Sequence, residues 1–210
     1  MSLETWLAFF VACWLISLSP GAGAISCMAA GLRYGFRRAL WNILGLIGGI
    51  MFVLLVVVIG LGALLAASTL AFAIVKWIGV AYLVWLGIQQ WRAPAFTVDA
   101  QAAKRALGAS PRELAVRGFL VNATNPKGIL FMLAVLPQFV DPARPQALQY
   151  AICGLSLAVT DLVVMSGYTL FAARVLVVLR EPHHVRLLNR AFGGLFVAAG
   201  AALATFKRAG

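Results

Sequence analysis

Six long apolar runs divide this chain and decide what it can fold into. A helix needs about 20 apolar residues to cross the hydrocarbon core of a bilayer. The runs cover residues 6–32, 40–66, 70–88, 118–140, 147–173 and 188–206. Across the chain 63% of residues are hydrophobic and 11% are charged, whereas soluble domains average about 45–50% and about 25%. We therefore expect an all-α polytopic membrane protein with six transmembrane helices in the lipid bilayer.

The basic residues are distributed unevenly between the connections. Twelve lysines and arginines lie in the connections after the first, third and fifth runs, whereas four lie on the opposite side, namely Lys76, Arg144, Lys207 and Arg208. Because positive residues concentrate on the cytoplasmic side of a membrane protein, we expect those three connections to be cytoplasmic and both termini to face outward. The same bias accounts for the net charge of +11 without a nucleic-acid partner.

The long polar connection over residues 93–116 separates two halves of three runs each. We expect a single transmembrane domain over residues 1–210, with a first repeat over about 1–92, a cytoplasmic loop over about 93–116 and a second repeat over about 117–210. Because a half with three crossings ends on the side opposite to its start, a second copy enters the membrane inverted. The first helix of each half contains a proline, Pro20 or Pro126, which favours this arrangement.

Two proline motifs interrupt the first helix of each half. The motifs are Ser19-Pro20-Gly21 and Asn125-Pro126-Lys127. A proline inside a helix removes one backbone donor and costs about 3 kcal/mol, and a lysine at bilayer depth costs roughly 2.5–3.5 kcal/mol. We expect helices 1 and 4 to be broken at Pro20 and Pro126. Costs of this size favour a function for the break and the charge, although Ser19-Pro20 taken alone would also fit an ordinary proline kink.

Lys127 and Asp161 are the two formal charges that lie well inside apolar runs. Lys127 lies ten residues after Arg117, and a rise of 1.5 Å per residue places it roughly 15 Å deep, half-way through a core about 30 Å thick. Asp161 lies near the middle of the fifth run. Ionisable residues at this depth usually mark substrate, ion or proton pathways, although a buried ion pair that only locks helices together would use the same two residues.

The helix breaks supply a second kind of binding group. After a break, the next half-helix presents free N–H groups that favour a carboxylate, and the carbonyl groups before the break favour a cation. Combined with a lysine and an aspartate, such a site suits a zwitterion. The candidate substrate-binding residues are Ser19, Pro20, Gly21, Asn122, Thr124, Asn125, Pro126, Lys127 and Asp161.

Other chemistries lack the residues that they need. Cys13, Cys27 and Cys153 lie far apart inside apolar runs, which is typical of small buried hydrophobic residues and not of a disulfide, metal or redox site. The apolar runs contain no histidine that could activate a serine, and the chain has no glycine-rich phosphate loop. We therefore expect neither an enzyme nor a bound metal or cofactor, whereas a pore stays open as an alternative to a carrier.

Three stretches resemble the LysE/RhtB family of amino-acid exporters. They are Leu18-Ser19-Pro20-Gly21, the run from Gly79 to Gly87, and Asn125-Pro126-Lys127 with Leu130-Phe131. The resemblance covers nearly the whole chain, and residues 85–92, 137–139 and 163–168 are similar to the homoserine and homoserine lactone efflux branch. Ala22 stands where many family members have a second proline, which close relatives in the homoserine branch also lack.

The resemblance implies a six-helix exporter of small neutral amino acids in the bacterial inner membrane, driven by proton antiport. Homoserine, homoserine lactone and threonine are the expected substrates. As a hypothesis, Lys127 and the half-helix end near Pro126 hold the substrate carboxylate, while Asp161 holds the ammonium group or takes the coupling proton. The alternatives are an exporter of another amino acid or small metabolite of the same family, and a pore-type facilitator. The sequence leaves open which amino acid is carried and whether the chain works as a homo-oligomer.

Overall fold

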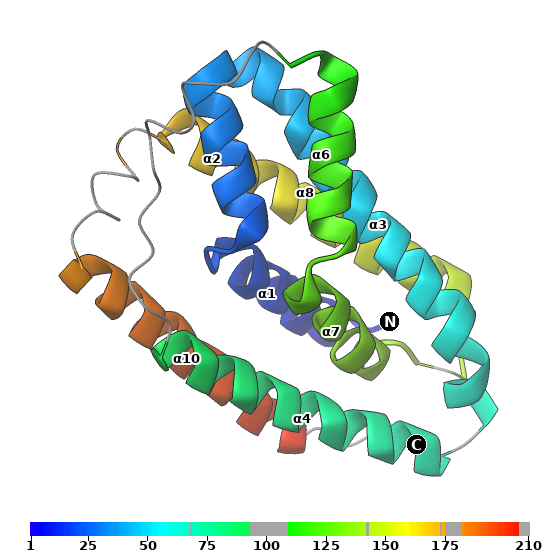
Figure 1. Ribbon diagram of the computed structural model, residues 1–210. Coiled ribbons are helices and arrows are strands. Elements are labelled where there is room, and N and C mark those ends of the chain that lie inside the picture. The colour runs from blue at the N-terminus through cyan, green and yellow to red at the C-terminus, as the bar shows by residue number, and fades with distance from the viewer. Residues whose placement is uncertain (68, 93–108, 142, 173, 175–181, 206–210) are drawn as a thin grey trace.

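Every regular element in the described part of the protein is a helix (Figure 1). The computed structural model describes residues 1–67, 69–92, 109–141, 143–172, 174 and 182–205. The helices are α1 (Leu3–Leu18), α2 (Ala22–Tyr34), α3 (Phe36–Ala67), α4 (Thr69–Arg92), α6 (Pro111–Ala123), α7 (Pro126–Ala134), α8 (Gln146–Leu170) and α10 (Pro182–Thr205), with a 3-10 helix, η1 (Leu136–Phe139). These elements confirm the expected all-α fold class.

Several of the described helices are long and apolar enough to cross a membrane. Three qualify alone, namely residues 36–60 of α3, residues 73–92 of α4, and α8, with mean hydropathies of 3.0, 1.2 and 1.7. Two bent pairs, α1 with α2 and α6 with α7, qualify as pairs, which gives up to five spans. The chain is therefore a multi-pass membrane protein, while the sixth span and the inverted repeat stay predictions.

Both expected helix breaks are present. α1 ends at Leu18 and α2 begins at Ala22, with a bend of 57° between them. α6 ends at Ala123 and α7 begins at Pro126, with a bend of 52°. Pro126 occupies the first turn of α7, where a missing N–H group removes no helical hydrogen bond. Each proline therefore lies at a place where the preceding helix has already stopped.

Two helices begin earlier than their apolar runs predict. α6 starts at Pro111, so residues 111–116 of the expected loop over about 93–116 are helical, and residues 93–108 lie outside the described residues. Ser110 Oγ accepts a hydrogen bond from Glu113 N, and the Glu113 carboxylate accepts one from Ser110 N. This capping box fixes the start of α6. α10 likewise begins at Pro182, ahead of its run. Polar turns outside the apolar region carry no hydrophobic signal, so apolar runs place these starts too late.

Glycines bring α3 and α6 into backbone contact. A Cβ atom at Gly45 would lie 2.0 Å from the Ala115 carbonyl oxygen, and one at Gly118 would lie 2.1 Å from the Asn42 carbonyl oxygen. No side chain fits at these distances, so both positions require glycine. Asn42 Nδ2 also donates to the Leu114 carbonyl oxygen at 3.2 Å. Such close approach of small residues is how helices associate in lipid, where hydrophobic burial contributes little between helices.

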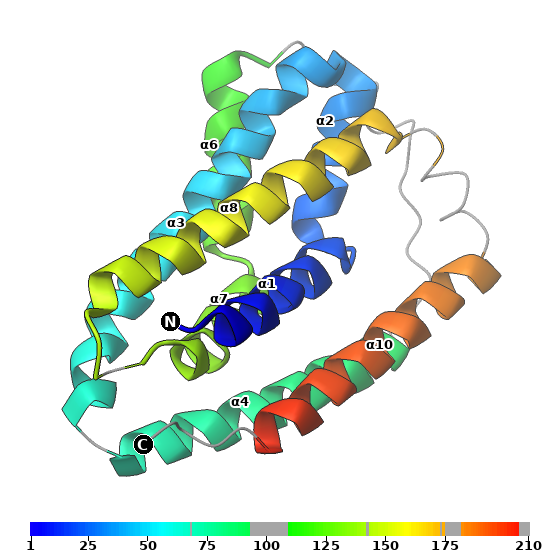
Figure 2. The ribbon, with the colours of Figure 1, turned by 180° about the vertical axis from the view of Figure 1, so that it is seen from behind.

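α4 and α10 lie side by side along one edge of the molecule, as Figure 1 and Figure 2 both show. Polar contacts join the two helices near the end of α4. Gln90 Nε2 donates to Asn189 Oδ1 at 2.8 Å, and Trp91 Nε1 donates to the Arg190 carbonyl oxygen at 2.9 Å. This pair forms a layer of its own, which we call the α4–α10 layer.

α1 and α7 lie between the α4–α10 layer and a group formed by α2, α3, α6 and α8 (Figure 1). Phe9, Met132 and Leu136, each 0% exposed, form the core around α1 and α7. Met28 and Ile43, also 0% exposed, form the core between α2 and α3. The two short half-helices α1 and α7 therefore occupy the centre of the molecule.

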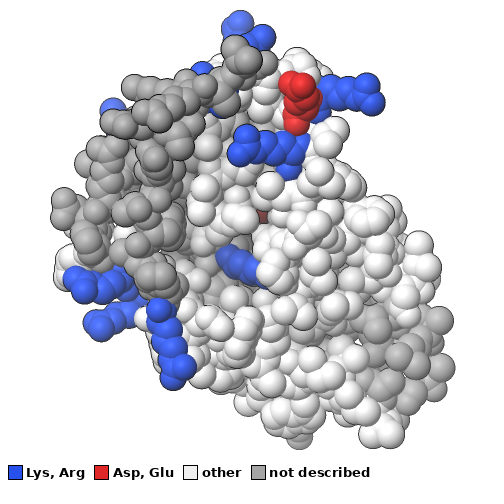
Figure 3. Space-filling model, in the orientation of Figure 1, with Lys and Arg blue, Asp and Glu red and all other residues white. Residues whose placement is uncertain are grey.

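The surface is apolar over broad areas. Ile59, Leu70 and Leu155 have exposed fractions of 79%, 69% and 68%. In Figure 3 the lower part of the face is largely uncharged, and lysines and arginines gather along its upper and left margins. A surface with this distribution suits a protein surrounded by lipid, with its basic residues at the water-facing ends.

Candidate substrate-binding site

Lys127 pairs with backbone carbonyl groups at the end of α1, where Pro20 cannot supply an N–H donor. In an unbroken helix the Ile16 carbonyl group would accept a hydrogen bond from the N–H group of residue 20, which proline lacks. Lys127 Nζ donates instead to the Ile16 carbonyl oxygen at 3.1 Å and to the Ser19 carbonyl oxygen at 2.8 Å. The partial negative charge at the C-terminal end of a helix also favours a cation there. The lysine of the second broken helix therefore completes the end of the first.

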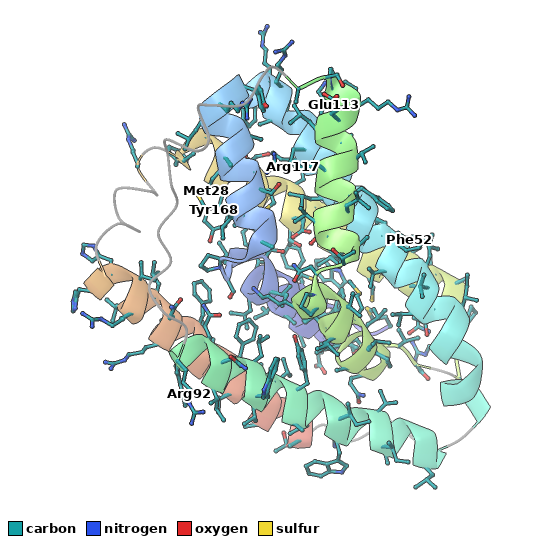
Figure 4. All side chains as sticks on the ribbon, in the orientation of Figure 1. Met28, Phe52, Arg92, Glu113, Arg117 and Tyr168 are labelled. Carbon is teal, nitrogen blue, oxygen red and sulfur yellow. The ribbon has the colours of Figure 1, made fainter. Side chains whose placement is uncertain are left out.

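A tyrosine from α8 completes the same turn. Tyr168 Oη donates to the Leu18 carbonyl oxygen at 2.6 Å. Figure 4 shows Tyr168 beside α2, which packs against α8. Backbone carbonyl groups inside a membrane need such partners because no bulk water is present to pair with them. Side chains from two other helices thus stabilise the unwound end of α1.

Asp161 lies on α8 and is 7% exposed. Ser17 Oγ, from the last turn of α1, donates to Asp161 Oδ1 at 2.5 Å. Within the described structure a salt bridge joins Arg144 to Asp141, 3.2 Å apart at the surface, and none joins Lys127 to Asp161. Lys127 and Asp161 are therefore not in direct contact, and the alternative of an ion pair that only locks helices together is not what the described residues show.

Lys127 and Asp161 nevertheless line one cavity of about 50 Å³. α1, α2, α3, α6, α7 and α8 all contribute to its wall. Of the residues expected from the sequence, it is lined by Ser19, Gly21, Asn122, Asn125, Lys127 and Asp161. One water molecule needs roughly 10–15 Å³ of such space. The cavity therefore admits a few water molecules, but not an amino acid, in this conformation.

Pro20, Thr124 and Pro126 are not among the residues that line this cavity. Thr124 follows the last residue of α6, and its Oγ1 donates to the Leu120 carbonyl oxygen at 2.7 Å. The two prolines lie in the breaks. These three residues therefore lie where one half-helix ends and the next begins, and they do not line the cavity.

The two half-helices that begin inside the apolar region differ in how their N-termini are capped. Asn125 Oδ1 accepts a hydrogen bond from Lys127 N at 3.1 Å, so a side chain caps α7. α2 begins after Gly21, and within the described structure no side chain caps it. The hypothesis drawn from the sequence places the substrate carboxylate at the half-helix near Pro126, whereas the uncapped N-terminus belongs to α2.

Asn122 extends from α6 to the start of α2. Its Nδ2 donates to the Leu46 carbonyl oxygen at 2.8 Å, which leaves its Oδ1 available to accept a hydrogen bond. A Cβ atom at Gly23 would lie 3.9 Å from that oxygen. The cavity therefore has an amide oxygen next to the first turn of α2, in addition to the carboxylate of Asp161.

The family model of the LysE type translocators matches residues 14–206. The chain belongs to this family. The translocator is 44% identical over 210 residues to a homoserine/homoserine lactone efflux protein of Salmonella typhimurium, with 100% of both chains covered. It is 42% identical to an uncharacterized membrane protein of Vibrio cholerae over 99% of this chain and 100% of that one. It is 27% identical to a leucine efflux protein of Klebsiella pneumoniae over 96% of this chain and 95% of that one. No solved structure matches the chain.

Membership of this family confirms the resemblance that the motifs indicated. The protein is a transporter and not an enzyme, as expected. Relatives named for homoserine efflux and for leucine efflux place the translocator among amino-acid exporters.

Three polar side chains that form hydrogen bonds at the site of the translocator were not among the residues expected from the sequence. They are Ser17, Tyr82 and Tyr168. Tyr82 Oη, from α4, donates to the Lys127 carbonyl oxygen at 3.3 Å. Ser17 has no signal beyond being polar in an apolar run, whereas Tyr82 lies in the run from Gly79 to Gly87 that resembles the family. Tyr168 lies in the stretch 163–168 that resembles the homoserine branch, and that position was the available signal.

Proposed function

We propose that this translocator exports a small neutral amino acid or its derivative across the inner membrane in exchange for protons. The proposed substrates are homoserine, homoserine lactone and threonine. The observation that carries the proposal is the cavity at the two helix breaks, because it holds one basic and one acidic side chain, Lys127 and Asp161. The 44% identity to a homoserine/homoserine lactone efflux protein over the full length supports the substrate class.

The cavity offers partners for both ends of a zwitterion. Lys127 supplies a positive charge for the carboxylate. Asp161 and the Oδ1 atom of Asn122 supply acceptors for the ammonium group. We assign the coupling proton to Asp161, because an acidic side chain at this depth is the usual element of a proton pathway through a membrane.

The pattern of helix contacts supports six spans in two inverted repeats. The first half consists of α1 with α2, then α3 and α4, and the second half of α6 with α7, then α8 and α10. The first span of each half packs on the second span of the other half, since α1 and α2 contact α8, and α6 contacts α3. The third spans, α4 and α10, contact each other. A two-fold axis that exchanges the halves produces this pattern. α10, with 24 residues, is about 36 Å long, which suffices to cross the core.

The distribution of basic residues supports an orientation with both termini outside. Arg37 lies in the first turn of α3, Arg92 in the last turn of α4 and Arg112 in the first turn of α6. These helix ends lie toward the upper and left margins of Figure 1, where Figure 3 shows the basic side chains. We assign this side to the cytoplasm because positive residues concentrate there.

A carrier fits the narrow cavity better than a pore does. A volume of about 50 Å³ is too small for an amino acid, so the cavity has to widen for each transported molecule. A pore-type facilitator would need a continuous passage. Another amino acid or small metabolite is the alternative within the family, since a 27% identical relative is named for leucine efflux.

An export assay in cells that lack their own amino-acid exporters tests the proposal. The cells are loaded with labelled homoserine, homoserine lactone, threonine or leucine, and efflux is measured with and without a proton gradient. We expect homoserine efflux to saturate and to slow when the gradient is collapsed. Efflux no faster than from cells with an empty vector, for every compound, would contradict the proposal. Efflux that neither saturates nor responds to the gradient would favour the pore.

A further inference from the structure

We propose that the carboxylate of the exported amino acid binds at the N-terminus of α2, where the free N–H groups of the first turn, the Ser19 hydroxyl group and Lys127 surround one space. The inference rests on the proposed function and adds to it which of the two half-helices takes the anion. The inference also predicts that substrates with a free carboxylate use this site differently from substrates without one.

The first turn of α2 has free backbone donors. Its first helical hydrogen bond runs from Ile25 N to the Gly21 carbonyl oxygen at 3.0 Å. The N–H groups of Ala22, Gly23 and Ala24 therefore have no acceptor within the helix. No side chain of the described residues caps this end, and Gly21, Gly23 and Ala24 line the cavity. Free N–H groups and the positive end of the helix dipole favour an anion.

Ser19 provides an independent sign of a missing partner. Its side chain is 3% exposed and lines the cavity. Its Oγ atom has no hydrogen-bond partner among the residues that the structure describes. A buried hydroxyl group without a partner is destabilising, so this serine is better explained by a ligand than by packing. A carboxylate at the start of α2 would accept its hydrogen bond.

Lys127 adds the charge. An ammonium group has three donors, and two of them are used by the carbonyl oxygens of Ile16 and Ser19. A Cβ atom at Gly21 would lie 4.0 Å from Lys127 Nζ, so the ammonium group is next to the residue before α2. One donor of the ammonium group is therefore left for a carboxylate at the start of α2. The competing N-terminus of α7 is occupied by the Asn125 side chain.

The arrangement predicts that an amino acid and its lactone use the site differently. Homoserine carries a free carboxylate, which can accept hydrogen bonds from the α2 turn and from Ser19. In the lactone the same carbon belongs to a neutral ring ester, which is a weaker acceptor and has no charge to interact with the helix end. Changes at Ser19 should therefore affect the acid more than the lactone.

The test compares Ser19→Ala with Ser19→Thr in purified protein in vesicles. We expect Ser19→Ala to raise the apparent KM for homoserine about tenfold, the effect of losing a hydrogen bond to a charged group, and to change the KM for the lactone less than twofold. Ser19→Thr keeps the hydroxyl group and should restore most of the affinity for homoserine. Because Ser19 Oγ bonds to no described residue, the melting temperature of Ser19→Ala without substrate should not fall.

A second pair of variants probes the backbone donors. Gly23→Ala adds a Cβ atom 3.5 Å from Leu46 Cδ2, an ordinary contact, so the protein should fold while the approach to the turn narrows. Gly48→Ala adds one 3.6 Å from Phe119 Cδ2, outside the cavity, and is the matched control. Added homoserine should raise the melting temperature of the wild type and of Gly48→Ala. The increase for Gly23→Ala should be much smaller.

The outcomes separate this inference from the proposed function. Equal KM shifts for homoserine and its lactone in Ser19→Ala, or no shift in either, would overturn the carboxylate position while export itself stands. A fall in the melting temperature of Ser19→Ala without substrate would show that the hydroxyl group has a structural role and would overturn it as well. If the wild type transports neither compound, the proposed function fails first, and the inference fails with it.

Discussion

Lys127 has a structural role in addition to the transport role that we propose for it. Two of its donors hold the carbonyl groups of Ile16 and Ser19 at the broken end of α1. Its ammonium group also lies 5.7 Å from the centre of the Phe196 ring of α10, within cation–π range. The lysine therefore connects three helices while it lines the cavity. The sequence raised structure and function as alternatives, and the geometry makes them compatible.

Replacing Asp161 with Asn should separate substrate movement from proton coupling. The amide oxygen can still accept the hydrogen bond from Ser17, but an amide does not bind and release a proton near neutral pH. A gradient of one pH unit supplies about 1.4 kcal/mol per proton, enough for about tenfold accumulation of substrate. We expect vesicles with the wild type to accumulate homoserine under such a gradient, and Asp161→Asn to allow equilibration at most.

Asp141→Asn is the matched control for that experiment. Asp141 pairs with Arg144 at the surface, and its side chain is 35% exposed. Accumulation should therefore persist in this variant. Gradient-driven accumulation by Asp161→Asn would remove that residue from the coupling step.

The site was partly predictable at this scale. Lys127 and Asp161 could be found because charged residues inside apolar runs are rare and costly. The different capping of the two half-helices was also present in the sequence, since asparagine precedes Pro126 and caps helices well, whereas Gly21 has no side chain. The hydrogen bond from Ser17 to Asp161 was not predictable, because it joins residues 144 positions apart whose proximity depends on the packing of α1 against α8.

At the scale of elements, the short half-helices depend on their surroundings. α7 has nine residues, and an isolated helix of that length is unstable in water. It is held by its core, where Phe131 and Met132 are 3% and 0% exposed, and by the hydrogen bond from Tyr82 to its first turn. Packing, rather than helix propensity, therefore fixes the position of Lys127.

Gly45→Ala should destabilise the protein through the contact between α3 and α6. The added Cβ atom would lie 2.0 Å from the Ala115 carbonyl oxygen, so the two backbones would have to separate. We expect a loss of about 1–3 kcal/mol in the free energy of unfolding, as for other overpacked positions, measured by thermal or denaturant unfolding in detergent. Gly194→Ala is the control, because nothing lies within 4 Å of its Cβ position. Equal stability of the two variants would be evidence against the backbone contact.

Element boundaries were less predictable than element type. The apolar runs located every α-helix that the structure describes, but they missed the polar first turns of α6 and α10. For α6 the missing signal was present as Ser110 and Glu113, the spacing of a capping box. Apolar periodicity and capping chemistry are separate signals, and the first alone finds only the part of a helix that lies in lipid.

At the scale of the whole molecule, the sequence did not show which helices pack against each other. Apolar runs show where helices lie along the chain, but the packing of α6 on α3 and of α1 and α2 on α8 is a property of the three-dimensional structure. Glycines of α3 and α6 lie at the interface between these two helices. Which helix they would contact depended on the three-dimensional arrangement.

The proposed orientation can be tested by labelling single introduced cysteines in intact cells. The native Cys13, Cys27 and Cys153 are 0% exposed, so they should react little. Ala143→Cys lies in the exposed connection before α8 and should react with a membrane-impermeant maleimide from outside. Arg112→Cys, in the exposed first turn of α6, should react only after the cells are opened. The reverse labelling pattern would show that both termini face the cytoplasm and that the basic helix ends face outward.

The α4–α10 layer also bears on how the protein is synthesised. α4 ends at Arg92, whereas α10 begins at Pro182 and therefore leaves the ribosome later than α4. Until then Gln90 and Trp91 lie in the nascent protein without the groups that they bond to at Asn189 and Arg190. A frameshift or stop codon before α10 would therefore do more than delete one span. It would also leave Gln90 and Trp91 without the hydrogen-bond partners that Asn189 and Arg190 provide, and α4 without the helix that packs along it.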